Sequence, residues 1–498
     1  MGDSIDARSF TRQDRTQFRA KTQRCLDALG VMLADGDFEV EAPQLGLEIE
    51  LNVVDERGDP AMANDAVLEA IASPAFQTEL GRFNVEINVA PRPIDGMHMQ
   101  ELEASLRSAF AAADERTRTT GCRLAMIGML STLNEHHFTE RWFSEDPRYS
   151  LLGQQILAAR GEDIELRLEG APLAEGMSAE NLDMVCETIL PEAACTSVQL
   201  HLQVAPESFS SYWNAAQAIA GVQVALAANS PFFAGKALWH ETRIPMFEQA
   251  TDTRPLELKN QGVRPRVWFG ERWVTSIFDL FEENSRYFPA LLPAVSDEDP
   301  FEALAAGVAP SLSELRMHNG TVYRWNRPIY DTVGDRPHLR LENRVLPAGP
   351  SMIDVLADAA FYYGLVRTLA EAERPLWTQM SFDAARENLS VAARDGIEAR
   401  LYWPELGWIS PRELVLRRLL PAAAEGLDAY GVDPSVRDRY LGIIEQRCLT
   451  GRNGAVWQRE DVVARERAGA TRTEALHGML EAYLERMHAG EPVHTWEH

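Results

Sequence analysis

Four segments of the sequence place acidic, amide, imidazole and guanidinium groups at every second position, with apolar residues between them. Residues i and i+2 of a β-strand share a face, so each segment would present a polar side and an apolar side. The polar positions are Glu48, Glu50, Asn52, Asn84, Glu86, Asn88, Ser197, Gln199, His201, Gln203, Arg340, Glu342 and Arg344.

Two interpretations of these polar faces are open. They could be the solvated sides of four half-exposed strands in an ordinary antiparallel sheet. However, the faces contain no lysine and no threonine, which solvated faces usually carry. Carboxylates gathered on one sheet face repel one another unless cations lie among them. The second interpretation is therefore a concave polar floor that binds divalent cations.

The residue types on these faces favour hard cations. Carboxylate oxygens with a single imidazole and no thiolate suit Mg²⁺, or Mn²⁺, better than zinc or copper. Mg²⁺ held by a few carboxylates usually also binds substrate phosphates. Arg340 and Arg344 flank Glu342 and could clamp phosphate or carboxylate groups. Metal ions together with arginine clamps are what phosphoryl transfer needs.

The common nucleotide and hydrolase motifs are absent. Gly235-Lys236 lacks the upstream glycine and the following Ser or Thr of a phosphate-binding P-loop. The sequence also has no GxGxxG, HExxH or GxSxG pattern. This disfavours P-loop enzymes, typical dinucleotide enzymes, zincins and α/β-hydrolases.

The elements that must position these residues can be predicted from periodicity. Strands are expected over residues 46–54, 83–89, 197–204 and 338–346, and helices over residues 16–35, 101–118, 211–228 and 351–373. After about residue 382 the alternating runs stop, and the chain is mostly helical with breaks near 403–411, 431–434 and 451–454. We therefore predict an α+β catalytic domain over residues 1–385 and a helical C-terminal region over residues 386–498.

Bulk properties narrow the class of protein. The chain has 498 residues, 45% of them hydrophobic, and a net charge of −27, which disfavours nucleic acids and anionic membranes as partners. Its five cysteines form no CxxC pair, and the N-terminus has no apolar leader. A cytoplasmic location is predicted, while the oligomeric state is not predicted.

The segments at these strands resemble the glutamate–cysteine ligase family, in the branch shared by plant enzymes, many bacterial enzymes and bacterial carboxylate–amine ligases. The order and spacing of several segments carry the resemblance, which spans roughly residues 40–375. They are residues 46–51, 79–86, 195–203, 228–232 with Gly235 and Arg243, 340–344, 146–149 and 323–328.

The resemblance implies a fold related to glutamine synthetase, in which a curved, mostly antiparallel sheet holds metals and ATP on its concave side and helices on its outer side. It also implies that ATP phosphorylates a carboxylate, giving an acyl phosphate that an amine attacks. The expected substrates are L-glutamate and L-cysteine, or another amine.

The resemblance also implies roles for individual residues. Glu48, Glu50, Glu79, Glu86 and Glu342 match metal ligands, and His201 matches a ligand or a nucleotide contact. Arg344 matches an arginine that faces phosphate, and Arg243 one that grips the amino-acid carboxylate or the phosphoryl group. Arg340, Gln199 and Arg327 are further candidates.

Each assignment has a structural alternative. Glu79 could be a charge on a helix face, His201 a hydrogen-bonded histidine of the sheet, Arg243 part of an interdomain salt bridge, and Arg327 a brace for its turn. Other functions also stay open: a ligase with another donor or acceptor, a phosphotransferase, and a non-catalytic sensor of amino acids or nucleotides. The segment 447–458 has no predicted role.

Overall fold

The computed structural model describes residues 10–36, 38 and 43–497. Its strands are β1 (Gln44–Asp55), β2 (Phe76–Thr78), β3 (Asn84–Pro93), β4 (Cys122–Ala125), β5 (Ile164–Glu169), β6 (Asn181–Cys186), β7 (Ser197–Gln203), β8 (Phe232–Phe233), β9 (Lys236–Ala237), β10 (Val267–Trp268), β11 (Tyr323–Arg324), β12 (Asn326–Val333), β13 (Arg336–Pro347), β14 (Leu401–Trp403) and β15 (Gly407–Ile409).

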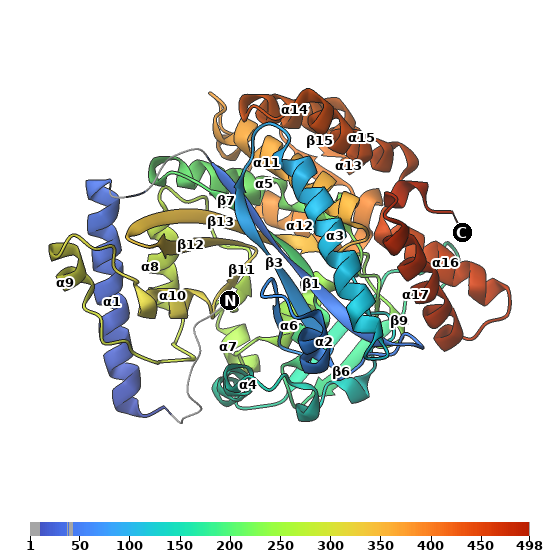
Figure 1. The fold of residues 1–498 in the computed structure, drawn as a ribbon, viewed down its shortest axis with the longest axis horizontal. Helices are drawn as coiled ribbons and strands as arrows, with labels where there is room; N and C mark the ends of the chain where they lie inside the picture. Colours follow the sequence, from blue (N-terminus) through green and yellow to red (C-terminus); the bar gives the residue numbers. More distant parts are fainter. Residues whose placement is uncertain (1–9, 37, 39–42, 498) are drawn as a thin grey trace.

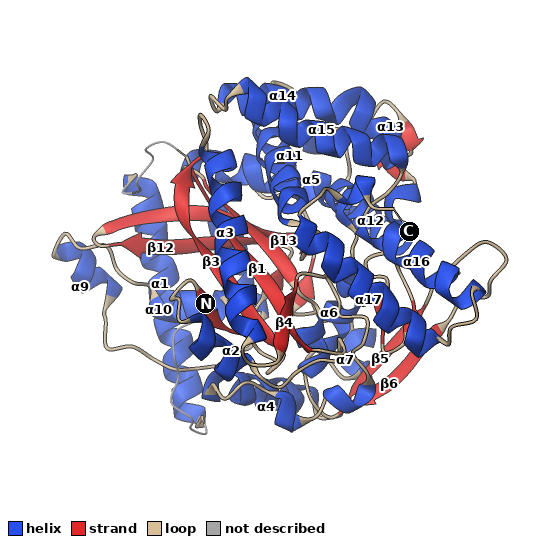
Figure 2. Cartoon of the chain, turned by 45° about the vertical axis from the view of Figure 1, so that its right-hand side comes forward, coloured by secondary structure: helices blue, strands red, loops and turns tan. Residues whose placement is uncertain are grey.

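Helices surround these strands (Figures 1 and 2). They are α1 (Arg12–Asp35), α2 (Asn64–Ile71), α3 (His98–Arg118), α4 (Pro147–Arg160), α5 (Phe209–Ala227), α6 (Arg243–Ala250), α7 (Leu256–Asn260), α8 (Ile277–Tyr287), α9 (Pro300–Ala305), α10 (Ser313–Asn319), α11 (Met352–Ala370), α12 (Phe382–Asp395), α13 (Pro411–Leu414), α14 (Leu420–Ala429), α15 (Pro434–Thr450), α16 (Gly454–Arg467) and α17 (Arg472–Ala489). None of the described helices is both long and apolar enough to cross a bilayer.

One antiparallel sheet organises the molecule. Within the described residues it has the strand order β12-β13-β7-β1-β3-β2, with β4 also paired to β1. The four predicted strands are thus neighbours, although they are far apart in the sequence. The register places Glu342 opposite His201, Glu48 opposite Gln199, and Glu50 opposite Glu86. The predicted polar positions therefore lie on one face of a continuous sheet.

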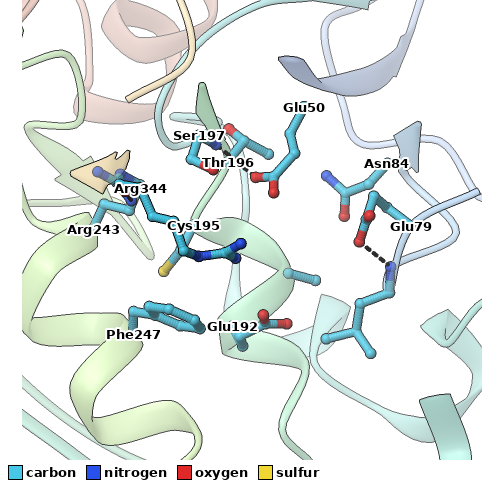
Figure 3. Close-up of a pocket in the computed structure, with 12 residues that line it drawn as sticks. Glu50, Glu79, Asn84, Glu192, Cys195, Thr196, Ser197, Arg243, Phe247 and Arg344 are labelled. Carbon is cyan, nitrogen blue, oxygen red and sulfur yellow. Dashed lines mark hydrogen bonds between the residues drawn. The ribbon is translucent and has the colours of Figure 1, made fainter. Parts of the chain in front are cut away.

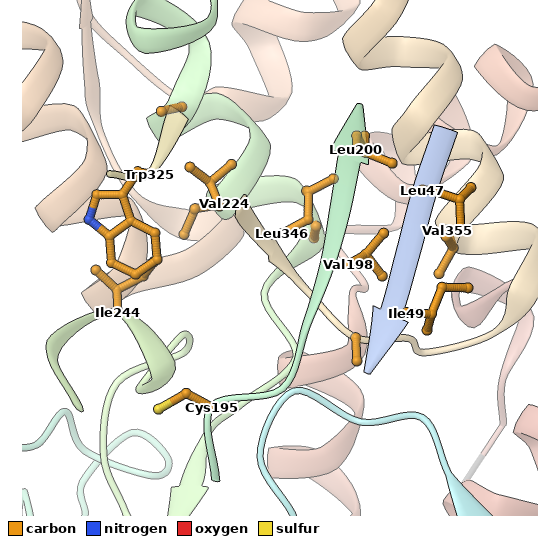
Figure 4. Close-up of a cluster of buried hydrophobic side chains, with 14 of the residues drawn as sticks. Leu47, Ile49, Cys195, Val198, Leu200, Val224, Ile244, Trp325, Leu346 and Val355 are labelled. Atoms are coloured by element: carbon orange, nitrogen blue, oxygen red, sulfur yellow. The ribbon is translucent and has the colours of Figure 1, made fainter. Parts of the chain in front are cut away.

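The opposite face of the sheet packs into the core. Leu47, Ile49, Val198 and Leu200 are at most 2% exposed, and Figure 4 shows them clustered with Val355 of α11. Burying apolar side chains of this size stabilises a fold by about 1.5–3 kcal/mol each. This one-sided burial fixes the strand register, since a slip of one residue would turn the carboxylates into the core.

Helices α5 and α11 cover this apolar face and are buried almost all round. Ser351 caps α11 by accepting a hydrogen bond from the Asp354 main-chain nitrogen, which starts the helix where the sequence predicted. Helix α5 ends just before Asn229 and Pro231. Both helices were predicted to within a few residues.

The C-terminal part is mostly helical, as predicted. At the predicted break near residues 403–411, β14 and β15 form a short hairpin that the sequence did not indicate. Strands of three residues are too short to show an alternating pattern. The proposed boundary at residue 385 falls inside α12, which packs on α5; the division into two domains stays a prediction.

The segment 447–458 contacts helix α11 and Asn229, which follows helix α5, and so connects the C-terminal helices to the helices that cover the sheet. Arg447, which is 1% exposed, lies 2.9 Å from the Asp354 carboxylate and 2.6 Å from that of Asp358. Gln458 donates to the Asn229 side-chain oxygen at 2.8 Å. Gly454 packs so closely on Asn229 that an added Cβ would overlap the side-chain oxygen.

Candidate active site

The polar face of the sheet forms the floor of a cavity of about 400 Å³. All the predicted site residues line this cavity except two, His201 and Arg243, which line adjoining cavities that share residues with it. The sheet therefore gathers the predicted residues into one site, and charge divides that site into two halves.

The first half, formed by β1, β3 and the loop after β2, is acidic. Among the described residues, neither Glu79 nor Glu86 forms an ion pair, and their hydrogen bonds come from the Leu80 main-chain nitrogen at 3.1 Å and the Asn88 amide at 2.7 Å. Glu50 accepts from the Ser197 main-chain nitrogen at 2.6 Å and from Gln199 at 2.9 Å. Glu79 and Glu86 therefore lie in a group of carboxyl groups that repel one another.

In the acidic half, burial and the charges of neighbouring carboxylates raise the pKa values of Glu79 and Glu86. Burial, and then the neighbouring Glu50 charge, raise the pKa of Glu79 to about 7. Burial and the nearby Glu79 raise the pKa of Glu86 well above its ordinary value. Carboxyl groups in this state are ready to exchange their protons for a metal cation.

The second half surrounds Glu342 with arginines. Arg327 lies opposite Glu342 on β12 and donates to both carboxylate oxygens, at 2.6 and 3.0 Å. Arg344 approaches the same carboxylate at 3.1 Å and also donates to the Gln199 oxygen. Burial alone would raise the pKa of Glu342, but Arg327 and Arg344 hold it well below its ordinary value. Glu342 is therefore ionised and anchors two guanidinium groups beside the acidic half.

His201 lies where the two halves meet. Its Nε2 atom is 3.2 Å from Glu48 and 3.9 Å from Glu342, while its Nδ1 atom accepts a hydrogen bond from Arg340 at 3.1 Å. Burial would raise the pKa of Glu48, but His201 lowers it to about 2. The buried Nε2 atom makes no hydrogen bond.

The donor set fits a hard divalent cation. Glu48, His201 and Glu342 each offer one ligand atom within 4.8 Å of the others. Glu50, Glu79 and Glu86 line the same cavity and form no ion pair with a described residue. Arg340 donates to Nδ1, so the tautomer that fits this hydrogen bond carries its proton on Nε2. A metal ion on Nε2 would require the proton to move to Nδ1, which would break the hydrogen bond from Arg340. The carboxylates are therefore the better matched ligands.

Arg243 starts helix α6 and is 2% exposed. Its Nε atom donates to Glu241 at 3.0 Å, and its terminal nitrogens donate to the main-chain oxygens of Arg344 and Val345. These carbonyls lie at the irregular stretch of β13 that follows Asn343. Arg243 thus braces the backbone that carries Arg344, and its predicted contact with substrate stays a prediction.

Sequence reasoning missed Glu192, which follows Pro191 in a short 3₁₀ turn before β7. Its carboxylate faces the same narrow cavity as Glu50 and Glu79 (Figure 3). Burial, and then the Glu79 and Glu50 charges, raise its pKa to about 8. Asn84, a predicted polar position, lines this cavity with a buried side-chain oxygen that has no hydrogen-bond partner. Glu192 belongs to no alternating run, so no periodic signal could identify it.

Comparison with protein-family models shows the family of the chain. The sequence model described as glutamate-cysteine ligase family 2 matches residues 44–481. The chain belongs to the glutamate-cysteine ligase family. As a member of this family it is an ATP-dependent ligase, which confirms the predicted family and enzyme class. No curated protein sequence gave a significant match.

Two solved structures were compared with this ligase. A glutamate–cysteine ligase from Francisella tularensis, solved in complex with AMP, has a TM-score of 0.54 at 12% identity over 91% of both chains. A bifunctional glutathione synthetase from Pasteurella multocida has a TM-score of 0.47 at 12% identity, covering 94% of this chain and 55% of that one. The first likeness confirms the predicted α+β architecture, with a curved antiparallel sheet and helices outside it.

Proposed function

We propose that this ligase joins the γ-carboxylate of L-glutamate to the amine of L-cysteine, using ATP and Mg²⁺, with Mn²⁺ as a substitute. The observation that carries the proposal is the division of one sheet face. Glu50, Glu79 and Glu86, which form no ion pair with a described residue, lie beside a cluster of arginines anchored on Glu342. The acidic half suits metal ions bound to phosphates, and the arginines suit the anions that react.

In this mechanism, Glu48, Glu50, Glu79, Glu86 and Glu342 would hold Mg²⁺, which supplies charge neutralisation for the ATP phosphates. Arg344 neutralises charge that develops as the γ-phosphoryl group moves to the substrate carboxylate. Arg340 and Arg327 stabilise anionic groups near His201 and Glu342. Gln199 holds Arg344 and Glu50 in place through hydrogen bonds to both.

The narrow cavity between Glu192 and Asn84 suits the amino-acid end of the donor. An α-ammonium group needs hydrogen-bond acceptors, and Glu192 and the unpartnered Asn84 oxygen provide two in one place. Arg243 and Arg344 lie on the same cavity wall and suit a carboxylate. The γ-carboxylate would then extend toward the acidic half, where it accepts the phosphoryl group.

Chemically, the γ-carboxylate oxygen attacks the γ-phosphorus of ATP and ADP leaves. The amine of cysteine then attacks the acyl carbon, the C–O bond to phosphate breaks, and the amine loses a proton. The products are the amide, ADP and inorganic phosphate. A carboxylate by itself is a poor electrophile, so the phosphorylation step is what makes amide formation accessible.

We also infer a cytoplasmic location. All five cysteines are free and buried, which is typical of proteins in a reducing compartment, and both ATP and a thiol substrate are available there.

The test is phosphate release from Mg²⁺-ATP with L-glutamate, with and without L-cysteine, and then with a panel of other amino acids and amines. The proposal expects release that depends on both substrates. Turnover that requires a different donor or acceptor would assign another carboxylate–amine ligation. Glu192→Gln is expected to raise the KM for glutamate by about tenfold or more, while the exposed Glu56→Gln serves as its matched control.

A further inference from the structure

A second cavity, of about 420 Å³, lies away from the sheet face, between helix α16 and the loop that joins β5 to β6. It shares no lining residue with the catalytic cavities. Its walls are Leu173, Ala174, His240, Val456, Arg459, Glu460, Val463, Ala464 and Arg467. The proposed ligation reaction uses none of these residues.

Arg459 is an unusual member of this wall, because it is a buried cation without a carboxylate partner. It is 6% exposed, and its guanidinium donates only to the main-chain oxygens of Leu238 and Pro172. Burial lowers its pKa to about 10, although the Glu180 charge acts in the opposite direction. A buried charge is costly unless an opposite charge compensates it, and no carboxylate of the described residues forms an ion pair with Arg459.

Arg467 lies two helical turns further along the same face of α16, at the exposed rim of the cavity. It too forms no ion pair with any described residue. The other charged group on the wall, Glu460, pairs with Arg452 at 3.4 Å. Burial lowers the pKa of His240 to about 3, so this side chain is neutral. The cavity therefore presents two arginines that form no ion pair with a described residue, within a chain of net charge −27. The nearby Glu180 pairs with Arg472 at 2.9 Å.

The rest of the wall is apolar. Leu173, Val456 and Val463 line the cavity together with the two arginines. Such a pocket, mostly apolar with a few convergent polar groups, is typical of sites for small organic molecules. Inorganic anions would leave this apolar surface uncovered.

We propose that this cavity is a binding site for a small organic anion, with a carboxylate or phosphate head on Arg459 and Arg467 and an apolar body against α16. A series of hydrogen bonds connects residues next to its lining with Arg243, which lines a catalytic cavity. Gln458, next to Arg459, holds Asn229, whose main-chain nitrogen donates to Glu241 at 2.8 Å. Glu241, next to His240, holds Arg243 at 3.0 Å. Binding here is therefore expected to change the rate of ligation.

The test is calorimetric titration of the full chain with hexanoate and with hexyl phosphate, each compared with hexanol and inorganic phosphate. We expect saturable binding of at least one hexyl anion, and its identity assigns the head group. Hexanol and inorganic phosphate should bind at least about tenfold more weakly, since each lacks one of the two interactions. Equal binding of hexanol, or no saturable binding of either anion, would overturn the site.

Variants assign the binding to this cavity. Ala464→Trp fills the rim and should abolish binding, and Arg467→Ser should weaken it by about tenfold. Arg459→Gln should abolish it, with Ala464→Trp as the independent variant if the buried substitution prevents folding. Arg19→Ser removes an exposed arginine on α1 and is the matched control.

Binding that survives Ala464→Trp would place the anion elsewhere. A ligation rate unchanged at saturation would refute the coupling to Arg243.

Discussion

Arg327 donates to both carboxylate oxygens of Glu342, at 2.6 and 3.0 Å, from the facing position on the neighbouring strand. The sequence predicted that Glu342 is a metal ligand, yet in this structure its carboxylate oxygens already accept hydrogen bonds from Arg327 and Arg344. Glu342 therefore holds Arg327 and Arg344 toward the cavity, whether or not it also contacts a metal. The first prediction follows from this pairing.

Replacing Arg327 with Met should lower the ligation rate by about 100-fold, since Glu342 then loses its forked partner and Arg344 loses its fixed position. Arg327→Lys should restore only part of the rate, because an ammonium group cannot make two parallel hydrogen bonds to one carboxylate. Steady-state kinetics measure both. Full activity in Arg327→Met would show that the pairing has no role in catalysis.

Glu48→Gln and Glu342→Gln should each remove most activity, by about 100-fold or more, while the protein stays folded. Glu342→Gln should also lower the melting temperature, because it leaves Arg327 and Arg344 without their carboxylate partner. Both side chains face the cavity and not the apolar core. Phosphate release and thermal unfolding should be measured on the same samples, with Glu56→Gln as the exposed control. Near-normal turnover in both variants would refute the assignment of this floor to metal and phosphate binding.

The metal-free protein should lose stability as the pH rises toward about 7. Folding raises the pKa of Glu79 from 4.5 to about 7, and a carboxyl group whose pKa rises on folding stabilises the protein only while it is protonated. Mg²⁺ competes with these protons, so the rise in melting temperature on adding Mg²⁺ should be larger above about pH 7 than in acid.

Glu79→Gln provides the control for this pH dependence, because glutamine cannot titrate. The variant should show a flatter stability profile and a smaller Mg²⁺ effect. If the wild-type response to Mg²⁺ were independent of pH, the acidic half would not be a metal site of the kind described.

Arg447→Met should destabilise the protein by about 3–5 kcal/mol, because it leaves the buried carboxylates of Asp354 and Asp358 without their cation. Urea unfolding followed by fluorescence measures this. Arg417→Met is the matched control, since Arg417 pairs with Glu413 at an exposed position on the surface. Equal stability of the two variants would mean that segment 447–458 does not fasten the C-terminal helices as described.

The sequence could predict those parts of the site that lie on strands. Period-two alternation in β1, β3, β7 and β13 identified both the core face and the polar face, because burial of one side enforces the pattern. The order of the strands was not readable, since pairing depends on contacts between distant segments. Glu192 was missed because it lies in a short turn, which has no periodic pattern. Arg243 was predicted, but its hydrogen bonds to Glu241 and to the main chain of β13 were not, because contacts between distant segments leave no periodic signal.

The C-terminal region shows the same limit. Its helices could be predicted from composition and breaks, but the role of Arg447 and Gln458 depends on Asp354 and Asn229, which lie far away in the sequence. The hairpin of β14 and β15 was missed because three residues are too few to define a period.

The most direct test of the central claim follows the oxygen atoms of the donor. L-Glutamate labelled with heavy oxygen in its γ-carboxylate is incubated with the protein, Mg²⁺-ATP and L-cysteine. Mass spectrometry then measures the masses of the products. An acyl phosphate intermediate predicts γ-glutamylcysteine and one heavy oxygen atom in each molecule of inorganic phosphate. Phosphate released without the label, or ATP consumed without an amide product, would contradict the account.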